Sequence, residues 1–243
     1  MLLYARWKFT VLLTALLVVV TARMALPANS INEIVLDCFG VLLIVAAVLS
    51  IFAERRFRLA ALLLGVPVIG LMIAGHAFPG EFSVNTRVVS RLLGGAFLGF
   101  TVVMTVRAVL TARDVTWDTI MGAFAGYVLI GVVWTQFFCA IDLASPGAFS
   151  LATSSSDRPI SDMDRQAVLE YFSFATLSTV GYGDVAPVSQ PARGLACFEA
   201  ICGQFYLAVL IAGLVGIRAA APNRRGDSLQ SDPGPKSPSA NST

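Results

Sequence analysis

The chain has 243 residues, of which 56% are hydrophobic and only 13% are charged, and its formal net charge is +2. Soluble domains carry about 25% charged residues, so this composition argues against a soluble protein, and the small net charge gives no electrostatic footprint for nucleic acid. The four cysteines lie in apolar stretches and show neither a disulfide framework nor a zinc-ligand spacing. The sequence therefore predicts an all-α membrane protein.

Six apolar stretches are long enough to be transmembrane helices, because a hydrocarbon core of about 30 Å needs about 20 helical residues. The predicted spans are residues 9–26, 34–53, 59–78, 88–110, 119–143 and 195–217. The first stretch also fits a cleaved signal peptide, since basic residues precede it and small residues follow it. Residues 164–183 are too short and too polar to span, and we expect them to form a re-entrant segment.

Basic and acidic residues collect on opposite sides of the predicted spans. The first side carries Arg6, residues 54–58 and Arg107, whereas the second carries Asp142 and Asp184. Lys and Arg are enriched in cytoplasmic loops, so the pattern predicts that both termini are cytoplasmic and that the re-entrant segment opens to the outside.

The re-entrant segment contains a known filter motif. Residues 176–184 read TLSTVGYGD, and the TVGYG within them is the sequence whose backbone carbonyl oxygens replace the hydration shell of K⁺ in potassium channels. Glycine allows backbone conformations that a side chain would obstruct. Residues 119–217 thus resemble the pore domain of the potassium channel family, and the six-span layout extends the resemblance upstream.

The resemblance implies a homotetramer in the lipid bilayer of the plasma membrane, with one K⁺-selective pore between four chains and no cofactor other than the permeant ion. It implies a selectivity filter made of Thr179, Val180, Gly181, Tyr182 and Gly183, with K⁺ bound at the first four. Their backbone would face the pore axis, and the ring of Tyr182 would point away from it.

The residues before the filter are expected to form the pore helix, which includes Thr176. Asp162 or Asp164 is predicted to cap its N-terminus. Tyr171 and Phe172 stand where many relatives have tryptophan, so the hydrogen bond available to the filter tyrosine differs.

Three further residues are candidates for roles around the filter. Asp184 would form an anionic ring at the outer mouth, or cap the turn behind the filter. Glu199 lies in a membrane helix, where charge is costly, and would line the cavity, hold a proton or pair with a polar group behind the pore helix. Gly203 stands where the resemblance places the hinge of the inner helix, with Gly213 and Gly216 as alternatives.

The fourth predicted span lacks the regular arginines of a voltage sensor. Arg87 and Arg91 lie at its outer end and Arg107 at its inner end, and residues 92–106 between them are uncharged. We expect these arginines to snorkel to the headgroups and the protein to respond weakly to voltage.

The sequence thus predicts three regions. Residues 1–114 form a four-helix transmembrane module, residues 115–218 form the pore domain, and residues 219–243 form a disordered cytoplasmic tail rich in Ser, Pro and Gly. No soluble ligand-binding domain is predicted after the last span, and no catalytic triad or phosphate loop indicates an enzyme. Two alternatives to a channel remain: a membrane sensor or scaffold with a channel fold but no conduction, and a potassium transporter subunit.

Overall fold

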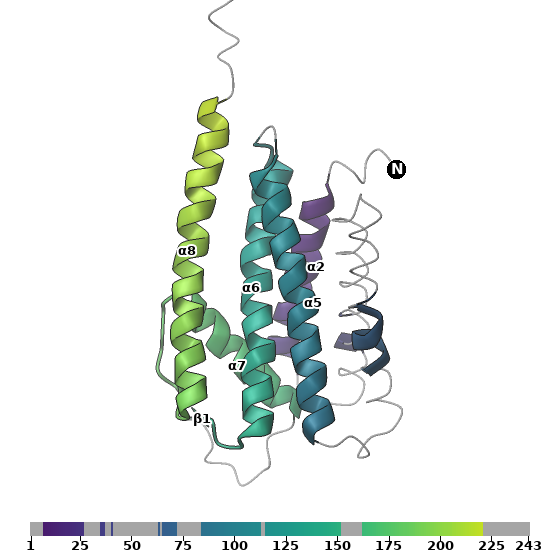
Figure 1. The fold of residues 1–243 in the computed structure, drawn as a ribbon, viewed down its shortest axis with the longest axis vertical. Coiled ribbons are helices and arrows are strands. Elements are labelled where there is room, and N and C mark those ends of the chain that lie inside the picture. The colour runs from purple at the N-terminus through teal and green to yellow at the C-terminus, as the bar shows by residue number, and fades with distance from the viewer. Residues whose placement is uncertain are drawn as a thin grey trace, which may run out of the picture.

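The computed structural model describes residues 7–26, 35–36, 40, 63, 65–71, 84–112, 115–151 and 162–220 (Figure 1). In this part of the chain, four helices are long and apolar enough to cross a membrane: Lys8–Ala25, Val84–Leu110, Trp117–Ala144 and Gln190–Gly213. They confirm helices at the first, fourth, fifth and sixth predicted spans. Most of the second and third predicted spans and nearly all of the predicted tail lie outside the described residues, but residues 65–71, within the third predicted span, are helical.

Helix α6 (Trp117–Ala144) is the centre of the bundle. It contacts α2 (Lys8–Ala25), α5 (Val84–Leu110), α7 (Asp162–Leu177) and α8 (Gln190–Ala220). Helices α2 and α5 lie on one side of α6, and α8 lies on the other (Figure 1). The first turn of α2 and the last turn of α8 lie at the same end of the bundle.

Side chains at the N-terminus of α6 cap two helices, α6 itself and α2. Thr116 is the N-cap residue, and its hydroxyl accepts a hydrogen bond from the Thr119 amide at 3.2 Å. One carboxylate oxygen of Asp118 accepts hydrogen bonds from the Phe9 amide at 3.1 Å and the Thr10 amide at 3.0 Å. These amides belong to the first turn of α2, where helices leave their N–H groups without internal partners, so α6 stabilises the start of α2.

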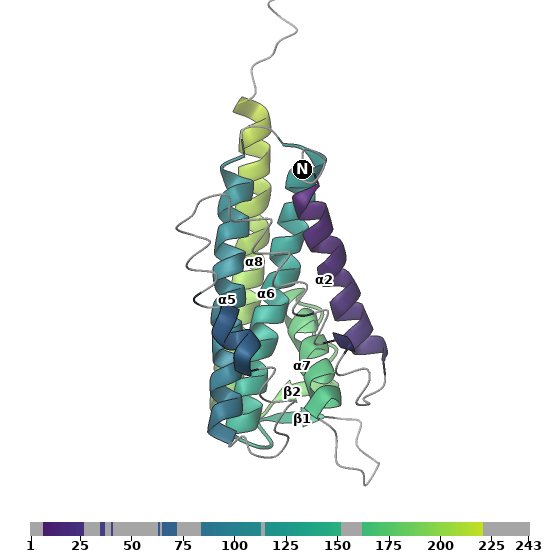
Figure 2. The same cartoon turned by 90° about the vertical axis from the view of Figure 1, so that its right-hand side faces the viewer.

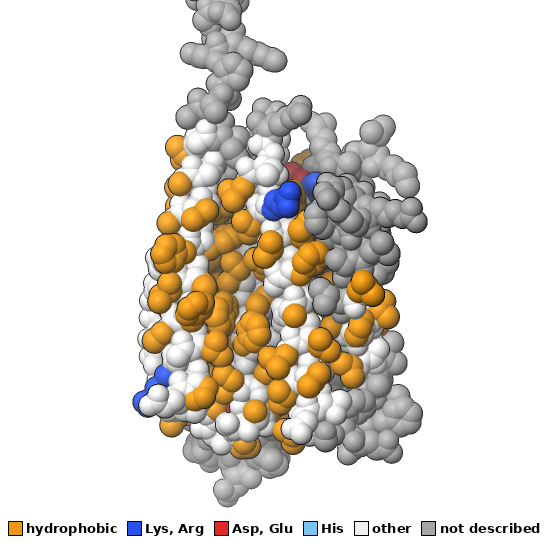
Figure 3. Space-filling view, in the orientation of Figure 1, with side chains coloured by type: hydrophobic (Ala, Val, Ile, Leu, Met, Phe, Trp, Pro, Cys, Tyr) orange, Lys and Arg blue, Asp and Glu red, His pale blue; other side chains and the backbone are white. Residues whose placement is uncertain are grey.

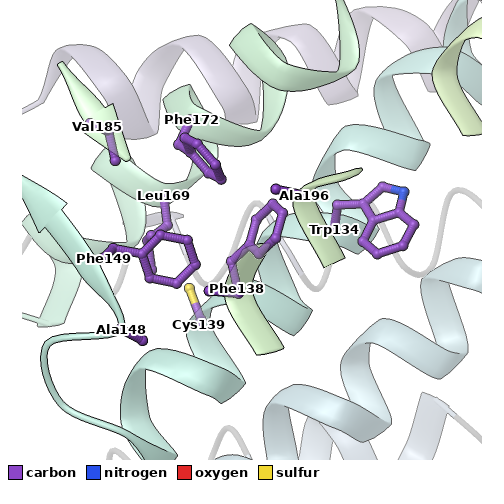
Figure 4. Packing of buried hydrophobic residues seen from close by; sticks show 10 residues of the cluster. Trp134, Phe138, Cys139, Ala148, Phe149, Leu169, Phe172, Val185 and Ala196 are labelled. Atoms are coloured by element: carbon purple, nitrogen blue, oxygen red, sulfur yellow. The ribbon is translucent and has the colours of Figure 1, made fainter. Parts of the chain in front are cut away.

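An aromatic cluster holds α6, α7 and α8 together at the opposite end of the bundle (Figure 4). Three phenylalanine rings pack edge to face, with ring centroids 5.2 to 5.5 Å apart. They are Phe138 of α6, Phe172 of α7 and Phe149, which lies between these two helices in the sequence. Such pairs contribute about 0.5–1.5 kcal/mol each beyond the burial of their area. Trp134 and Ala196 extend the cluster to α8.

Helix α7 enters the bundle without crossing it. Its 16 residues rise by about 24 Å, less than a hydrocarbon core of about 30 Å. Strand β1 (Phe149–Leu151) precedes α7, strand β2 (Val185–Pro187) follows it, and the two pair antiparallel. Because both strands lie at the same end of the bundle (Figure 2), the chain between them goes in and returns, which is the geometry of a re-entrant segment.

The helix starts differ from those predicted. The described part of helix α7 begins at Asp162, which puts Asp162 and Asp164 near its start, and the prediction that one of them is the N-cap depends on residues outside the described part of the chain. Acidic residues still stabilise this end of a helix through its dipole. Helix α8 begins at Gln190, before the apolar stretch starts, because the Ser189 hydroxyl accepts a hydrogen bond from the Ala192 amide at 3.3 Å and so caps the helix.

Candidate functional site

The chain between α7 and β2 has an unusual backbone. Thr179, Gly181 and Gly183 have φ of 60°, 55° and 82°, so alternate residues are left-handed. An ordinary strand has negative φ throughout and cannot adopt this path. A Cβ added at Gly181 or Gly183 would meet nothing within 4 Å, so these positions favour glycine for its backbone freedom and not for close packing.

Thr179 is strained, because left-handed φ is rare for a β-branched residue and costs about 1–2 kcal/mol. Hydrogen bonds to the last turn of α7 hold it. The Thr179 amide donates to the Thr176 carbonyl at 3.0 Å, and the amides of Val180 and Gly181 donate to the Ala175 carbonyl at 2.9 and 3.2 Å. The end of α7 therefore fixes where this backbone begins.

Residues 178–184 are all exposed in the single chain. The side chains of Val180 and Tyr182 are 53% and 71% exposed, although both are large and apolar or aromatic. Figure 1 shows this stretch leaving α7 at mid-height and running beside α8 toward β1. A strip of backbone polar groups is thus presented along one side of the bundle.

Tyr182 and Asp184 both contact Tyr171 of α7. The rings of Tyr182 and Tyr171 stack with centroids 6.1 Å apart and planes 11° apart. Desolvation and a hydrogen bond to the Asp184 carboxylate raise the pKa of Tyr171. Asp184 also accepts a hydrogen bond from the Val185 amide at 3.1 Å, so it caps the turn into β2. Phe172, the next residue in α7, points into the buried aromatic cluster and not toward Tyr182 and Asp184.

The last turn of α7 is held between α6 and α8. The Tyr127 hydroxyl of α6 donates to the Leu177 carbonyl at 3.2 Å. On the other side, a Cβ added at Gly203 of α8 would lie 2.6 Å from the same carbonyl oxygen. Gly203 is therefore needed for close contact between two backbones. Gly213 is also tightly packed, since a Cβ there would lie 2.6 Å from the side chain of Leu110.

Glu199 is fully buried and points at α7. Its Oε1 lies 2.5 Å from the Ser173 hydroxyl, which also lies 2.8 Å from the Gly131 carbonyl oxygen of α6. Its Oε2 has no hydrogen-bond partner among the described residues. Of the arrangements expected for Glu199, the structure shows pairing with a polar group on the re-entrant helix.

Arg91 of α5 hydrogen-bonds to two other helices of the bundle. Arg91 is part-buried, and its Nη1 donates to the amide oxygens of Gln136 in α6 at 3.2 Å and Gln166 in α7 at 2.7 Å. Arg91 therefore has hydrogen-bond partners within the bundle, and its position relative to the headgroups stays a prediction. The two amide oxygens offset part of the free energy that desolvating the guanidinium costs.

A bidentate ion pair joins the start of α7 to the end of α6. Arg165 donates to both carboxylate oxygens of Asp142, with an Nη2–Oδ1 distance of 2.7 Å. Asp142 is almost fully buried, so the pair is partly shielded from solvent. The sequence places both residues on the expected outer side but carries no signal that they meet.

Ser173 and Gln166 were also missed from the sequence. Gln166, Glu170 and Ser173 lie at i, i+4 and i+7, which places them on one face of α7. In a helix otherwise rich in aromatic residues, this polar stripe was the available signal. It faces α5, α6 and α8 in turn, as the contacts of Arg91, Gly131 and Glu199 show.

The comparison with known families agrees with this geometry. A family model described as "Ion channel" matches residues 167–217, which include most of α7, the exposed backbone strip and nearly all of α8. No curated protein matches the chain. The matched residues are similar to an ion channel domain, and with the four helices long and apolar enough to cross a membrane they support an ion channel family.

Proposed function

We propose that the protein is a potassium-selective channel of the plasma membrane, in which K⁺ moves down its electrochemical gradient between four identical chains. The observation that carries the proposal is the backbone of residues 179–183. It is left-handed at alternate positions, exposed, and fixed to the end of a re-entrant helix. Backbone carbonyls on such a path can replace the hydration shell of K⁺.

The direction of α7 supports cation binding. Its C-terminus precedes the candidate filter, and the C-terminal end of a helix carries a partial negative charge. Tyr127 and Gly203 fix this end against α6 and α8. Four such ends around one axis would stabilise a cation that has lost its water.

The exposed side of α8 supports a tetramer. Phe198, Ile201 and Phe205 lie at i, i+3 and i+7, so they share one face, and more than half of each side chain is exposed. Figure 3 shows hydrophobic side chains along α8 and the helices beside it. One chain supplies only one strip of carbonyls, so a closed ring requires further copies, and cyclic symmetry is the ordinary way to form it.

The position of Arg91 supports weak voltage dependence. Residues 92–106 carry no charge, and Arg91 is held by Gln136 and Gln166. Movement of α5 across the membrane field would therefore transfer little charge. Lys8 in the first turn of α2 and Arg218 in the last turn of α8 belong to helix ends that lie at the same end of the bundle (Figure 1), which favours cytoplasmic termini.

An ion flux assay tests the proposal. Purified protein in liposomes should take up Rb⁺ or K⁺ along a K⁺ gradient and exclude Na⁺. The particle should have the mass of four 25.8 kDa chains. Correctly folded tetramers that carry no selective flux at any pH or voltage would favour a sensor or scaffold with a channel fold.

A further inference from the structure

Glu170 is a buried carboxyl on the re-entrant helix that the proposed conduction path does not use. Its side chain is 1% exposed, and its Oε2 has no hydrogen-bond partner among the described residues. A carboxyl group left in this state costs free energy unless a nearby charge compensates for it.

Compensating charge comes from the N-terminal helices. Arg23 of α2 and Arg91 of α5 both act on Glu170 electrostatically. Arg91 also donates to Gln166 at 2.7 Å, one helical turn before Glu170 on the same face of α7. The guanidinium of Arg91 thus interacts with α7 in two ways: it donates a hydrogen bond to Gln166, and its charge acts on Glu170.

Burial moves the ionisation of Glu170 from the acidic range toward neutral pH. Burial raises the pKa of Glu170 to about 7, and the charges of Arg23 and Arg91 oppose this rise. Two titratable residues of α6, Cys139 and Asp142, lie near the same charged groups as Glu170. Asp142 is already paired with Arg165. Above this pH the carboxylate is negative and attracts Arg91, and below it the attraction is lost.

We infer that Arg91 is a positioning residue for the filter, which links the N-terminal helices to α7 through Gln166 and Glu170. Displacement of α5 relative to α6 then moves the start of α7. The end of α7 holds residues 179–181 through the carbonyls of Ala175 and Thr176, so this displacement reaches the filter. The inference rests on the proposed function only where conduction is the measured quantity.

The first test measures the link itself, without conduction. Hydrogen–deuterium exchange of the full chain in lipid nanodiscs is compared for Arg91→Gln and Arg107→Gln at pH 8. Arg107 is an exposed arginine on the same helix and serves as the matched control. We expect amides of residues 164–178 to exchange roughly tenfold faster in Arg91→Gln, as for loss of a charge-assisted hydrogen bond. Arg107→Gln should match the wild type, and Arg91→Lys should recover part of the protection.

The second test measures selectivity against pH in liposomes. The ratio of Rb⁺ to Na⁺ flux should be higher above a midpoint near pH 7, where Glu170 is ionised. Glu170→Gln should remove this dependence. Arg91→Gln should move the midpoint upward, because a nearby positive charge lowers the pKa of a carboxyl.

The outcomes separate the inference from the proposed function. Unchanged exchange and an unchanged pH profile in Arg91→Gln, with selective flux in the wild type, would overturn the inference and leave the channel intact. Faster exchange in Arg91→Gln, with no selective flux in the wild type, would support the link and refute the proposed function.

Discussion

Gly203 brings the backbone of α8 against the carbonyl oxygen of Leu177, where a Cβ would lie only 2.6 Å from that oxygen and 2.9 Å from Leu177 Cδ1. The resemblance to potassium channels gives this glycine the role of a hinge. The structure gives it a second reason to be glycine, which is close packing against the end of the re-entrant helix. The two roles lead to different effects of substitution.

Gly203→Ala should destabilise the protein by about 1–3 kcal/mol, since the added methyl group forces α7 and α8 apart. Gly194→Ala is the matched control, because a Cβ there meets nothing within 4 Å on the same helix. Gly194→Ala should raise the stability of the protein by about 0.5–1 kcal/mol, because alanine favours a helix more than glycine does. Thermal unfolding in detergent micelles measures both. An altered open probability in Gly203→Ala without any loss of stability would point to the hinge alone.

Ser173→Ala should cost about 1–3 kcal/mol, because it removes the hydroxyl beside the buried Glu199 and leaves Oε1 without this partner. Glu199→Gln should cost less, since an amide can still form a hydrogen bond with Ser173. The two residues touch, so the double variant should show a coupling energy of at least about 0.5 kcal/mol in a double-mutant cycle. Additive effects would mean that the contact contributes nothing to stability.

Hydropathy and charge predicted the helices that the structure describes, because a membrane leaves the chain few alternatives to long apolar helices. The unusual backbone of residues 179–183 was predictable in part, since Gly181 and Gly183 allow left-handed φ. Both signals are local, so no knowledge of neighbouring helices was needed to interpret them.

The partners of polar residues could not be predicted in the same way. The sequence shows that Arg91 lies near a helix end, but it does not show which groups the guanidinium contacts. Its hydrogen bonds to Gln136 and Gln166 form only when α5, α6 and α7 pack together. The strand pair β1–β2 was missed because each strand has only three residues, too few for an alternating pattern. Contacts between distant segments thus account for most of what the sequence did not reveal.

Arg165→Ala should destabilise the protein by roughly 2–4 kcal/mol, because it leaves the nearly buried carboxylate of Asp142 without its ion-pair partner. The double variant Asp142→Asn with Arg165→Ala should recover part of this loss, since no uncompensated charge remains. Arg165→Lys should lie between them, because an ammonium group cannot reproduce the bidentate geometry. Thermal unfolding at neutral pH measures the series. Equal stability of Arg165→Ala and the wild type would contradict the structural role of the pair.

Gly181→Ala should lower K⁺-selective flux strongly and change global stability little. An alanine at a φ of 55° costs about 1–2 kcal/mol locally. The exposed loop can relieve this strain by changing its backbone, because nothing packs within 4 Å of the added methyl group. Rb⁺ and Na⁺ flux in liposomes and thermal unfolding, measured on the same preparation, test both parts. A fully selective Gly181→Ala protein would show that left-handed backbone is not required at this position.

Tyr171→Phe separates the two contacts that Tyr171 makes, one with Tyr182 and one with Asp184. Phenylalanine keeps the ring stacked on Tyr182, whereas it loses the hydrogen bond to Asp184. Because desolvation and this hydrogen bond raise the pKa of Tyr171 above its ordinary value near 10, the hydroxyl remains protonated and donates at every pH up to that value. The contribution of the hydrogen bond to selectivity should therefore be constant from pH 6 to 9. We expect Tyr171→Phe to lower the Rb⁺ to Na⁺ flux ratio equally across that range, and Tyr171→Leu, which also loses the stacked ring, to lower it further. If Phe and Leu lowered the ratio equally, the ring stack would contribute nothing and the hydrogen bond to Asp184 would alone support the outer end of the filter.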